Sequence, residues 1–410
     1  MTRRNLVIGL VLLASSLAPG DRSWAQQRMA PPDAKVSVTA ENGVPEIAFR
    51  LVNHHVLIPV SVNGSGPLEV ILDTGMPAPG LALYDGDRIE PLGLEINPAI
   101  QAAVGGAGGS KRLTAQVAMS ESFAFDGVAV EGAMVVVLPR LGLDGYNDGV
   151  VGYSLFSNFA VELDYEKSLI TLHDPAAFVP PDEALVLPLT FRQRVPYATV
   201  RVTPLVGEPF DADVAVDLGA SHALSLNWDE SERIEVPDGA VTTIIGRGAS
   251  GVVKGQAGRI AALELAGARL ENVVTSFPVR EHQNPRGIDS LAGNLGNGAL
   301  RRFNLVFDYA GEKLYLTPNA SFSEEFRFDR SGLRLAVGQR LAVESVVAGS
   351  PADHAGLRVG DVVTRLNGTA VSGKEYGEAK QILMGDGTVE VEFERASESL
   401  TVSFELRQLI

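Results

Sequence analysis

The chain has 410 residues, which is enough for two or three domains. Hydrophobic residues make up 45% of it and charged residues 20%, a composition typical of a folded globular protein. The formal net charge of −16 argues against a nucleic-acid partner, because an acidic surface repels phosphate groups. The absence of cysteine excludes disulfides, zinc–thiolate sites and thiol catalysis.

Residues 1–25 are predicted to be a secretory signal peptide. Arg3 and Arg4 supply its positive start, and residues 6–18 form an apolar stretch too short to span a bilayer as a helix. A small-x-small cleavage site ends at Ala25. The export route is left open, because residues 2–6 also resemble a twin-arginine signal. Residues 26–45 read as a polar linker, and no transmembrane span is expected in the mature chain.

The region from 46 to 318 is predicted to be rich in β-strands. Short runs of Val, Ile and Leu are broken there by Gly, Pro, Asn and Asp, which is the pattern of strands joined by turns. Long helical periodicity is scarce. The clearest predicted strands are 56–62, 69–72, 134–138, 160–164 and 169–172.

This region contains an internal repeat. An apolar run leads into Asp73-Thr74-Gly75, and a second one leads into Asp217-Leu218-Gly219, 144 residues later. Segments that begin at Gly149 and Gly293 share a Gly, a Phe and an Asp-Tyr pair at the same offset. The repeat predicts two similar lobes, 46–178 and 179–322, related by a pseudo-twofold axis.

The register of the repeat is left open at one place. The Gly-rich stretches 104–109 and 245–250 are offset by 141 residues instead of 144. At this shorter offset, residues 148–152 also match residues 289–293. Two pairings of the closing glycines therefore remain possible from the sequence.

The last region, 326–410, has a different pattern that mixes helices and strands. Ser350 suits a helix N-cap, Pro351 its first turn, and Gly356 its end. Asn367-Gly368 is a two-residue turn signal between strands. A second helix is expected within 374–384, and closing strands within 389–393 and 400–406.

The duplicated region resembles the bacterial retropepsin-like aspartyl proteases, in which one chain carries two lobes. The resemblance rests on the two Asp-x-Gly motifs, on Val150-Val151-Gly152, and on the two closing segments that contain Phe and Asp-Tyr. It covers about residues 46–318. It implies a mostly β protein with two retropepsin-like β-barrel lobes about a pseudo-twofold axis.

The last region resembles a bacterial, circularly permuted PDZ domain with an α+β fold. The resemblance rests on residues 349–357, 359–363 and 366–368. It implies a groove that accepts an extended or C-terminal peptide by strand addition. By the same resemblance, the loop that holds the peptide carboxylate would be Gly332-Leu333-Arg334-Leu335.

Two carboxylates that share one proton can activate a water molecule and protonate a leaving amine. Asp73 and Asp217 are therefore the predicted catalytic pair. Gly75 and Gly219 would let each loop turn tightly, so that backbone N–H groups reach the carboxylates. The Gly-rich stretches would form flaps over a bound peptide, with Gly105, Gly106, Gly108, Gly246 and Gly248 as the candidate flap glycines. The reaction needs no metal or cofactor, and none is predicted.

The two aspartate loops depart from the family pattern in different ways. The resemblance implies a hydroxyl residue directly after each aspartate to tie the loops together, and Thr74 has one whereas Leu218 does not. It also implies a Ser or Thr two residues after the glycine, which Ser221 provides and Pro77 does not. We therefore expect Asp217, with a donor from Ser221, to hold the charge of the pair. Asp73 would then hold the proton.

The favoured interpretation is an exported aspartic endopeptidase, with the periplasm as the expected location. The PDZ domain would recruit or regulate polypeptide substrates. One alternative is a catalytically inactive periplasmic protein that binds peptides as a scaffold. Another is a protein that cleaves only itself. Cleavage assays with Asp73→Asn and Asp217→Asn variants would separate these functions.

Overall fold

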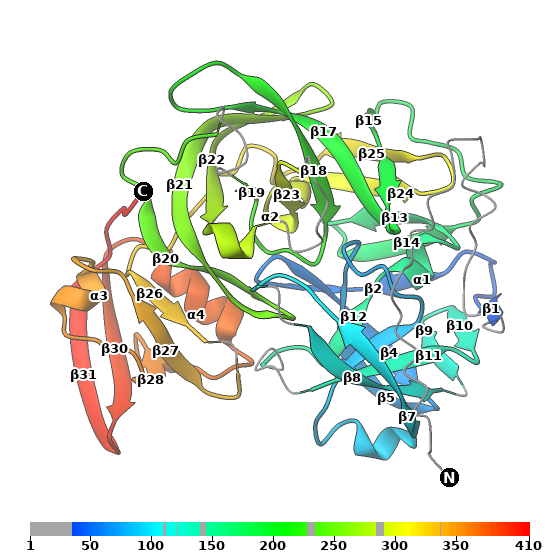
Figure 1. Cartoon of the computed structure of the whole chain (residues 1–410), viewed down its shortest axis with the longest axis horizontal. Coiled ribbons are helices and arrows are strands. Elements are labelled where there is room, and N and C mark those ends of the chain that lie inside the picture. Colours follow the sequence, from blue (N-terminus) through cyan, green and yellow to red (C-terminus); the bar gives the residue numbers. More distant parts are fainter. Residues whose placement is uncertain are drawn as a thin grey trace, which may run out of the picture.

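The computed structural model describes residues 35–109, 112–120, 122–139, 145–227, 234–283, 291–336 and 338–410. The predicted signal peptide and the first part of the 26–45 linker lie outside these ranges, as do residues 289 and 290 of the alternative glycine pairing. The described chain is mostly β, with two β lobes followed by an α+β domain, as the sequence predicts (Figure 1). Within these ranges no helix has the length and apolar character needed to cross a membrane.

The first lobe is built on one curled sheet. Its main path runs β4-β5-β12-β6-β11-β8-β7. Along this path, β5 and β12 run parallel, as do β6 and β11, and the other neighbours run antiparallel. The strands are β4 (His55–Val62), β5 (Ser65–Leu72), β12 (Gly149–Val151), β6 (Leu81–Tyr84), β11 (Met134–Leu138), β8 (Leu113–Met119) and β7 (Glu95–Val104), extended by β1 (Lys35–Val38), β10 (Val128–Glu131), β9 (Ser122–Phe125) and β3 (Arg50–Val52).

The second lobe repeats this sheet strand for strand. Its path runs β17-β18-β23-β19-β22-β21-β20, with the same sequence of parallel and antiparallel pairs. A further pairing of β17 with β21 closes the sheet on itself. The strands are β17 (Val195–Thr203), β18 (Phe210–Asp217), β23 (Gly293–Gly296), β19 (Leu224–Leu226), β22 (Ala268–Pro278), β21 (Gly251–Leu265) and β20 (Val241–Gly248), with β16 (Thr190–Arg192) beside β17.

The strand register decides between the two glycine pairings. Gly149 lies opposite Val70, and Gly293 lies opposite Val214. Gly293 lies 144 residues after Gly149, and Val214 lies 144 residues after Val70, so the closing segments correspond at this offset. A short helix follows each closing strand, α1 (Tyr153–Phe156) in the first lobe and α2 (Asn297–Leu300) in the second.

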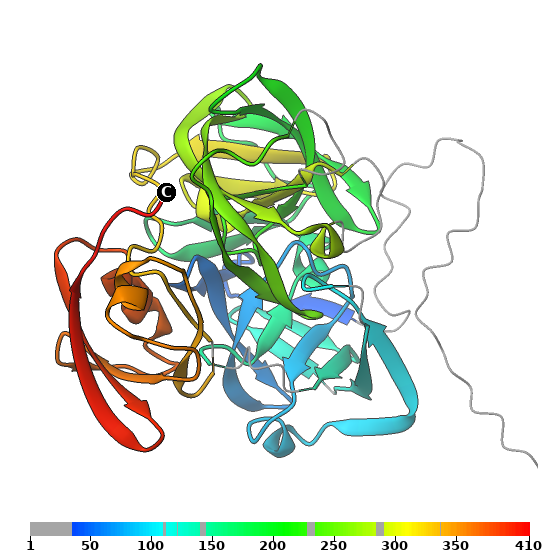
Figure 2. The same ribbon diagram turned by 60° about the vertical axis from the view of Figure 1, so that its left-hand side comes forward.

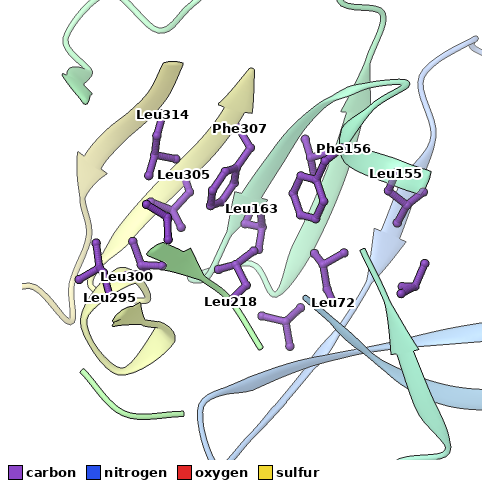
Figure 3. Close-up of a cluster of buried hydrophobic side chains, with 14 of the residues drawn as sticks. Leu72, Leu155, Phe156, Leu163, Leu218, Leu295, Leu300, Leu305, Phe307 and Leu314 are labelled. Carbon is purple, nitrogen blue, oxygen red and sulfur yellow. The ribbon is translucent and has the colours of Figure 1, made fainter. Parts of the chain in front are cut away.

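A six-stranded sheet joins the two lobes. Its order is β15-β25-β24-β13-β14-β2, so the two lobes contribute three strands each and meet where β13 pairs with β24. The strands are β13 (Ala160–Asp164), β14 (Leu169–His173), β2 (Glu46–Ala48), β24 (Phe303–Asp308), β25 (Lys313–Pro318) and β15 (Leu185–Pro188). One large buried apolar cluster contains side chains from both lobes (Figure 3). The two lobes therefore pack against each other, as the ribbon shows (Figure 2).

The C-terminal domain has its own core and its own sheet, in the order β26-β27-β28-β30-β31. The Ser350 hydroxyl accepts a hydrogen bond from the Asp353 N–H, and Gly356 has a φ of 81°, so both helix signals are confirmed. Helix α4 begins two residues later than the predicted range. The elements are β26 (Leu333–Leu335), β27 (Leu341–Val346), α3 (Pro351–His354), β28 (Val362–Leu366), β29 (Thr369–Ala370), α4 (Tyr376–Leu383), β30 (Thr388–Arg395) and β31 (Glu398–Glu405).

Candidate active site

Asp73 and Asp217 occupy the same place in the two lobes. Asp73 directly follows β5, and Asp217 ends β18, at the point where each buried apolar strand gives way to a turn. The N–H of Gly75 donates to Asp73 Oδ1 at 2.6 Å, and the N–H of Gly219 donates to Asp217 Oδ1 at 3.0 Å. Each carboxylate is therefore held by the backbone of its own turn in the same way.

The two aspartate turns are in contact. A Cβ atom added to Gly219 would lie 2.3 Å from Asp73 Cγ and 2.6 Å from both of its carboxylate oxygens. The Asp73 carboxyl group therefore packs directly on the backbone of the turn that carries Asp217. Glycine is required at 219 for this close approach, which a side chain would prevent.

Thr74 ties the two turns together from one side. Its side chain is buried, its hydroxyl donates to the carbonyl of Val216 at 2.7 Å, and it accepts from the N–H of Leu218 at 2.9 Å. The reciprocal bonds cannot form, because Leu218 has no hydroxyl. Its side chain is fully buried in the core shared by the lobes, near Leu72 (Figure 3). Apolar packing thus takes the place of the second hydrogen-bonded tie.

Asn294 on β23 is a site residue that sequence reasoning missed. Its Nδ2 donates to Asp217 Oδ2 at 2.7 Å, and its Oδ1 lies 3.2 Å from His222 Nε2. Burial lowers the pKa of His222, which favours a neutral ring that donates from Nε2 to Asn294. The repeat could have pointed to Asn294. A polar asparagine stands there, whereas the corresponding residue of the first lobe, 144 positions earlier, is the apolar Val150.

Ser221 contributes to the site through its backbone. Its carbonyl lies 2.8 Å from His54 Nδ1, which donates to it across the seam between the lobes. The side-chain donor on Asp217 Oδ2 is Asn294, in the role that we expected for the Ser221 hydroxyl. The carbonyl of His54 in turn accepts from Asn297 Nδ2 at 2.6 Å. Burial lowers the pKa of His54 to about 3, so this contact is made by a neutral ring at ordinary pH.

The two Gly-rich hairpin tips touch each other. The N–H of Gly106 donates to Ser250 Oγ at 3.1 Å, and the N–H of Ser250 donates to the carbonyl of Ala107 at 3.0 Å. Gly105, Gly106 and Gly108 lie in the turn after β7. Gly246 and Gly248 lie within β20, beside an irregularity in its pairing with β21. The tips from the two lobes thus form one joined pair.

The C-terminal domain is docked on the second lobe, beside the β20–β21 hairpin (Figure 1). An ion pair between Arg247 of β20 and Glu344 of β27 links the two. Residues 332–335, predicted to be a loop, line this junction, and Leu333–Leu335 form strand β26. Gly332 has a φ of 84°, and its N–H donates to Asp329 Oδ1 at 2.5 Å. Burial raises the pKa of Asp329 to about 6.

Comparison with known proteins identifies the C-terminal domain. Residues 342–395 match the family model of the PDZ domain. This region is a PDZ domain. No curated protein matches the chain in sequence. Among the described residues, no group of three or more His, Asp or Glu side chains is placed to hold a metal ion.

Three solved structures show what the chain is similar to. An aspartic proteinase from Irpex lacteus has 12% identity and a TM-score of 0.44, covering 68% of this chain and 99% of that one. The photosystem II D1 C-terminal processing protease has 26% identity over 22% of this chain and 25% of that one, with a TM-score of 0.19. The HtrA3 PDZ domain bound to a phage-derived ligand has 21% identity over 20% of this chain and 85% of that one, with a TM-score of 0.17.

Proposed function

We propose that this protein is an aspartic endopeptidase in which Asp73 and Asp217 form the catalytic pair. The observation that carries the proposal is the packing of the Asp73 carboxyl group on Gly219, within the turn that holds Asp217. The two turns come from corresponding strands and hold their carboxylates by the same backbone bond. Two acids placed in this way can share one proton between them.

The surroundings of the two carboxylates give them different roles. Asp217 accepts hydrogen bonds on both carboxylate oxygens, on Oδ1 from the N–H of Gly219 and on Oδ2 from Asn294 Nδ2. Asp73 is more exposed. Asp217 would therefore take a proton from the attacking water, while Asp73 donates its proton to the peptide carbonyl oxygen. The tetrahedral intermediate then collapses: Asp217 gives its proton to the departing amine, and Asp73 takes a proton back from a hydroxyl of the intermediate.

The substrate in this proposal is an extended polypeptide. It would lie between the aspartate pair and the joined hairpin tips, which would have to part for it to enter. The PDZ domain would hold a second, extended or C-terminal peptide segment. Export to the periplasm is part of the same proposal and rests on the N-terminal sequence.

The test is cleavage of an unfolded protein by the full chain and by two variants. Asp73→Asn and Asp217→Asn should each lower turnover by about 1,000-fold or more, because both carboxylates take part in proton transfer. Asp211→Asn is the matched control, since Asp211 is an exposed strand residue paired with Arg201, and it should keep full activity. Undiminished cleavage by either Asp73→Asn or Asp217→Asn would overturn the proposal.

Only one of the two turns, at Thr74, supplies a hydroxyl that bonds to the other turn. This departure from a symmetric pair favours a second candidate function, which is peptide binding without hydrolysis. The same assay separates the two. Binding of the unfolded protein with no turnover would favour a binding protein. A single cut within the chain, with no cleavage of added protein, would favour self-processing.

A further inference from the structure

The second lobe has a row of polar side chains on the sheet face that carries its aspartate. Asn294 of β23 marks this face, because its side chain reaches the carboxylate of Asp217. Residues that lie opposite each other on paired strands project from the same face of a sheet. Ser225 of β19 lies opposite Asn294, and Ser276 of β22 lies opposite Ser225. We call Asn294, Ser225 and Ser276 the polar row.

The same three positions of the first lobe are apolar. Val150 of β12 stands where the second lobe has its asparagine. Ala82 of β6 lies opposite Val150, and Val136 of β11 lies opposite Ala82. We call these three residues the apolar row. Met76, from the turn of Asp73, packs on the cluster that contains them, so each row begins beside an aspartate.

Both rows face away from the large core. Side chains alternate between the two faces of a sheet along each strand. Leu224 and Leu295, the neighbours of the polar row, are buried in the core cluster, and so are Leu81 and Val135, the neighbours of the apolar row. The two rows therefore form the opposite face of each sheet, where the aspartate side chains lie.

A cavity of about 740 Å³ between the PDZ domain and the second lobe reaches the polar row. Its wall includes Ser276 together with Ser221 and His222, the residues that follow the Asp217 turn. The hydroxyls of Ser225 and Ser276 make no hydrogen bond with another described residue. Each can therefore donate to and accept from a ligand.

An extended substrate would present one side chain to each row. The peptide bond to be cleaved would lie between the two aspartates. The two residues that flank this bond point to opposite sides of an extended chain. One of them would therefore contact the first lobe and the other the second.

We propose that the apolar row binds an aliphatic side chain of the substrate and that the polar row binds an uncharged, hydrogen-bonding side chain such as Asn. The proposal names the substrate class of the peptidase function proposed above and rests on it. An aliphatic side chain at the polar row would cover both serine hydroxyls without bonding them. An acidic side chain there would be repelled by the Asp217 carboxylate, and a basic one would hold that carboxylate in an ion pair.

The test uses four quenched fluorescent octapeptides that differ only in their two central residues, Leu-Leu, Asn-Asn, Leu-Asn and Asn-Leu. Leu and Asn have nearly the same shape and differ in hydrogen bonding. One of the two mixed peptides, the one that brings Asn to the polar row, should have a kcat/KM at least about tenfold above the other three. Equal kcat/KM values for the four peptides, or a preference for Leu-Leu, would overturn the proposal.

Exchanges between the rows assign the preference to these residues. The double variant Ser225→Ala with Ser276→Ala should bring Leu-Leu to within about twofold of the preferred mixed peptide. Ala82→Ser places in the apolar row the residue found at the corresponding position of the polar row, and it should raise the cleavage of Asn-Asn by about fivefold. Ser399→Ala, at an exposed residue of β31, is the matched control and should keep the wild-type ranking. An unchanged ranking in both the double variant and Ala82→Ser would overturn the proposal.

A binding measurement separates this proposal from the peptidase function. Fluorescein-labelled forms of the same four peptides are titrated with the Asp73→Asn variant, and fluorescence anisotropy should show the preferred mixed peptide bound about fivefold more tightly than Leu-Leu. If the wild type cleaves all four peptides equally, the peptidase function stands and the specificity fails. If it cleaves none, the peptidase function fails, and equal or unequal affinities still decide whether the two rows discriminate.

Discussion

Gly219 shows how a residue without a side chain can set the arrangement of two neighbouring carboxyl groups. Because a Cβ at this position would overlap the Asp73 carboxyl group, Gly219→Ala should push the two turns apart. We expect kcat/KM to fall by about 100-fold, since small displacements of reacting groups are costly. The control is Gly338→Ala, where a Cβ meets no atom closer than 3.8 Å and activity should be unchanged. Full activity in Gly219→Ala would show that the turns need not touch.

Asn294 is a second single residue that makes the surroundings of the two aspartates different, because it donates a hydrogen bond to Asp217. Asn294→Val reproduces the residue found at the corresponding position of the first lobe, Val150, and removes the donor to Asp217. A carboxylate that loses a donor is ionised less readily, so the acid limb of the pH–activity profile should move to higher pH. We also expect kcat/KM to fall by about tenfold. A lower rate with an unmoved acid limb would mean that Asn294 has only a structural role.

At the scale of elements, the joined hairpin tips are the part that the proposed function requires to move. Gly108 has a φ of 108°, and a Cβ there would lie 2.2 Å from the carbonyl oxygen of Gly251. Gly108→Ala should therefore separate the tips, and hydrogen exchange of the β7–β8 and β20–β21 turns should become faster. Gly105→Ala is the control, because its Cβ would meet only Arg112 Cγ at 3.9 Å. Equal exchange in both variants would contradict a joined pair.

At the scale of the whole molecule, two half-buried histidines link stability to pH. They lie where the lobes meet the PDZ domain: His55 contacts the Tyr146 hydroxyl, and Tyr146 stacks on Tyr376 of α4. Burial lowers the pKa of His54 to about 3 and that of His55 to about 4. The unfolded chain binds these protons near pH 6.5. The stabilisation is therefore complete above pH 6.5 and is lost as the pH falls toward 4.

This linkage can be measured by urea unfolding at pH 7 and pH 4.5. His55→Gln cannot take up the proton, so the wild type should lose on the order of 2 kcal/mol more stability than this variant over that interval. His354→Gln makes the same chemical change at an exposed position and should follow the wild type. Parallel pH dependence of His55→Gln and the wild type would rule out His55 as the source.

The elements could be predicted from the sequence where the signal is local. The strands Met134–Leu138 and Ala160–Asp164 match their predicted ranges, because apolar runs between turn residues allow one register. The internal sequence repeat also predicted that the two lobes would have similar sheets. The contact of Asn294 with Asp217 and the bond from Lys380 to Asn53 join residues 77 and 327 positions apart. No local pattern encodes such pairs, so the support of Asp217 and the interdomain cavity emerged only from the fold.

The central pairing of β13 with β24 also has a consequence for synthesis. Val161 and Leu163 lie opposite Phe307 and Leu305, so the inner edge of β13 has no partner until about 140 further residues have been made. A nascent chain presents an apolar strand edge during that interval. We expect a chain arrested before residue 303 to pair β13 with the same strand of another copy. A true twofold dimer would then form where the finished protein has only an approximate axis.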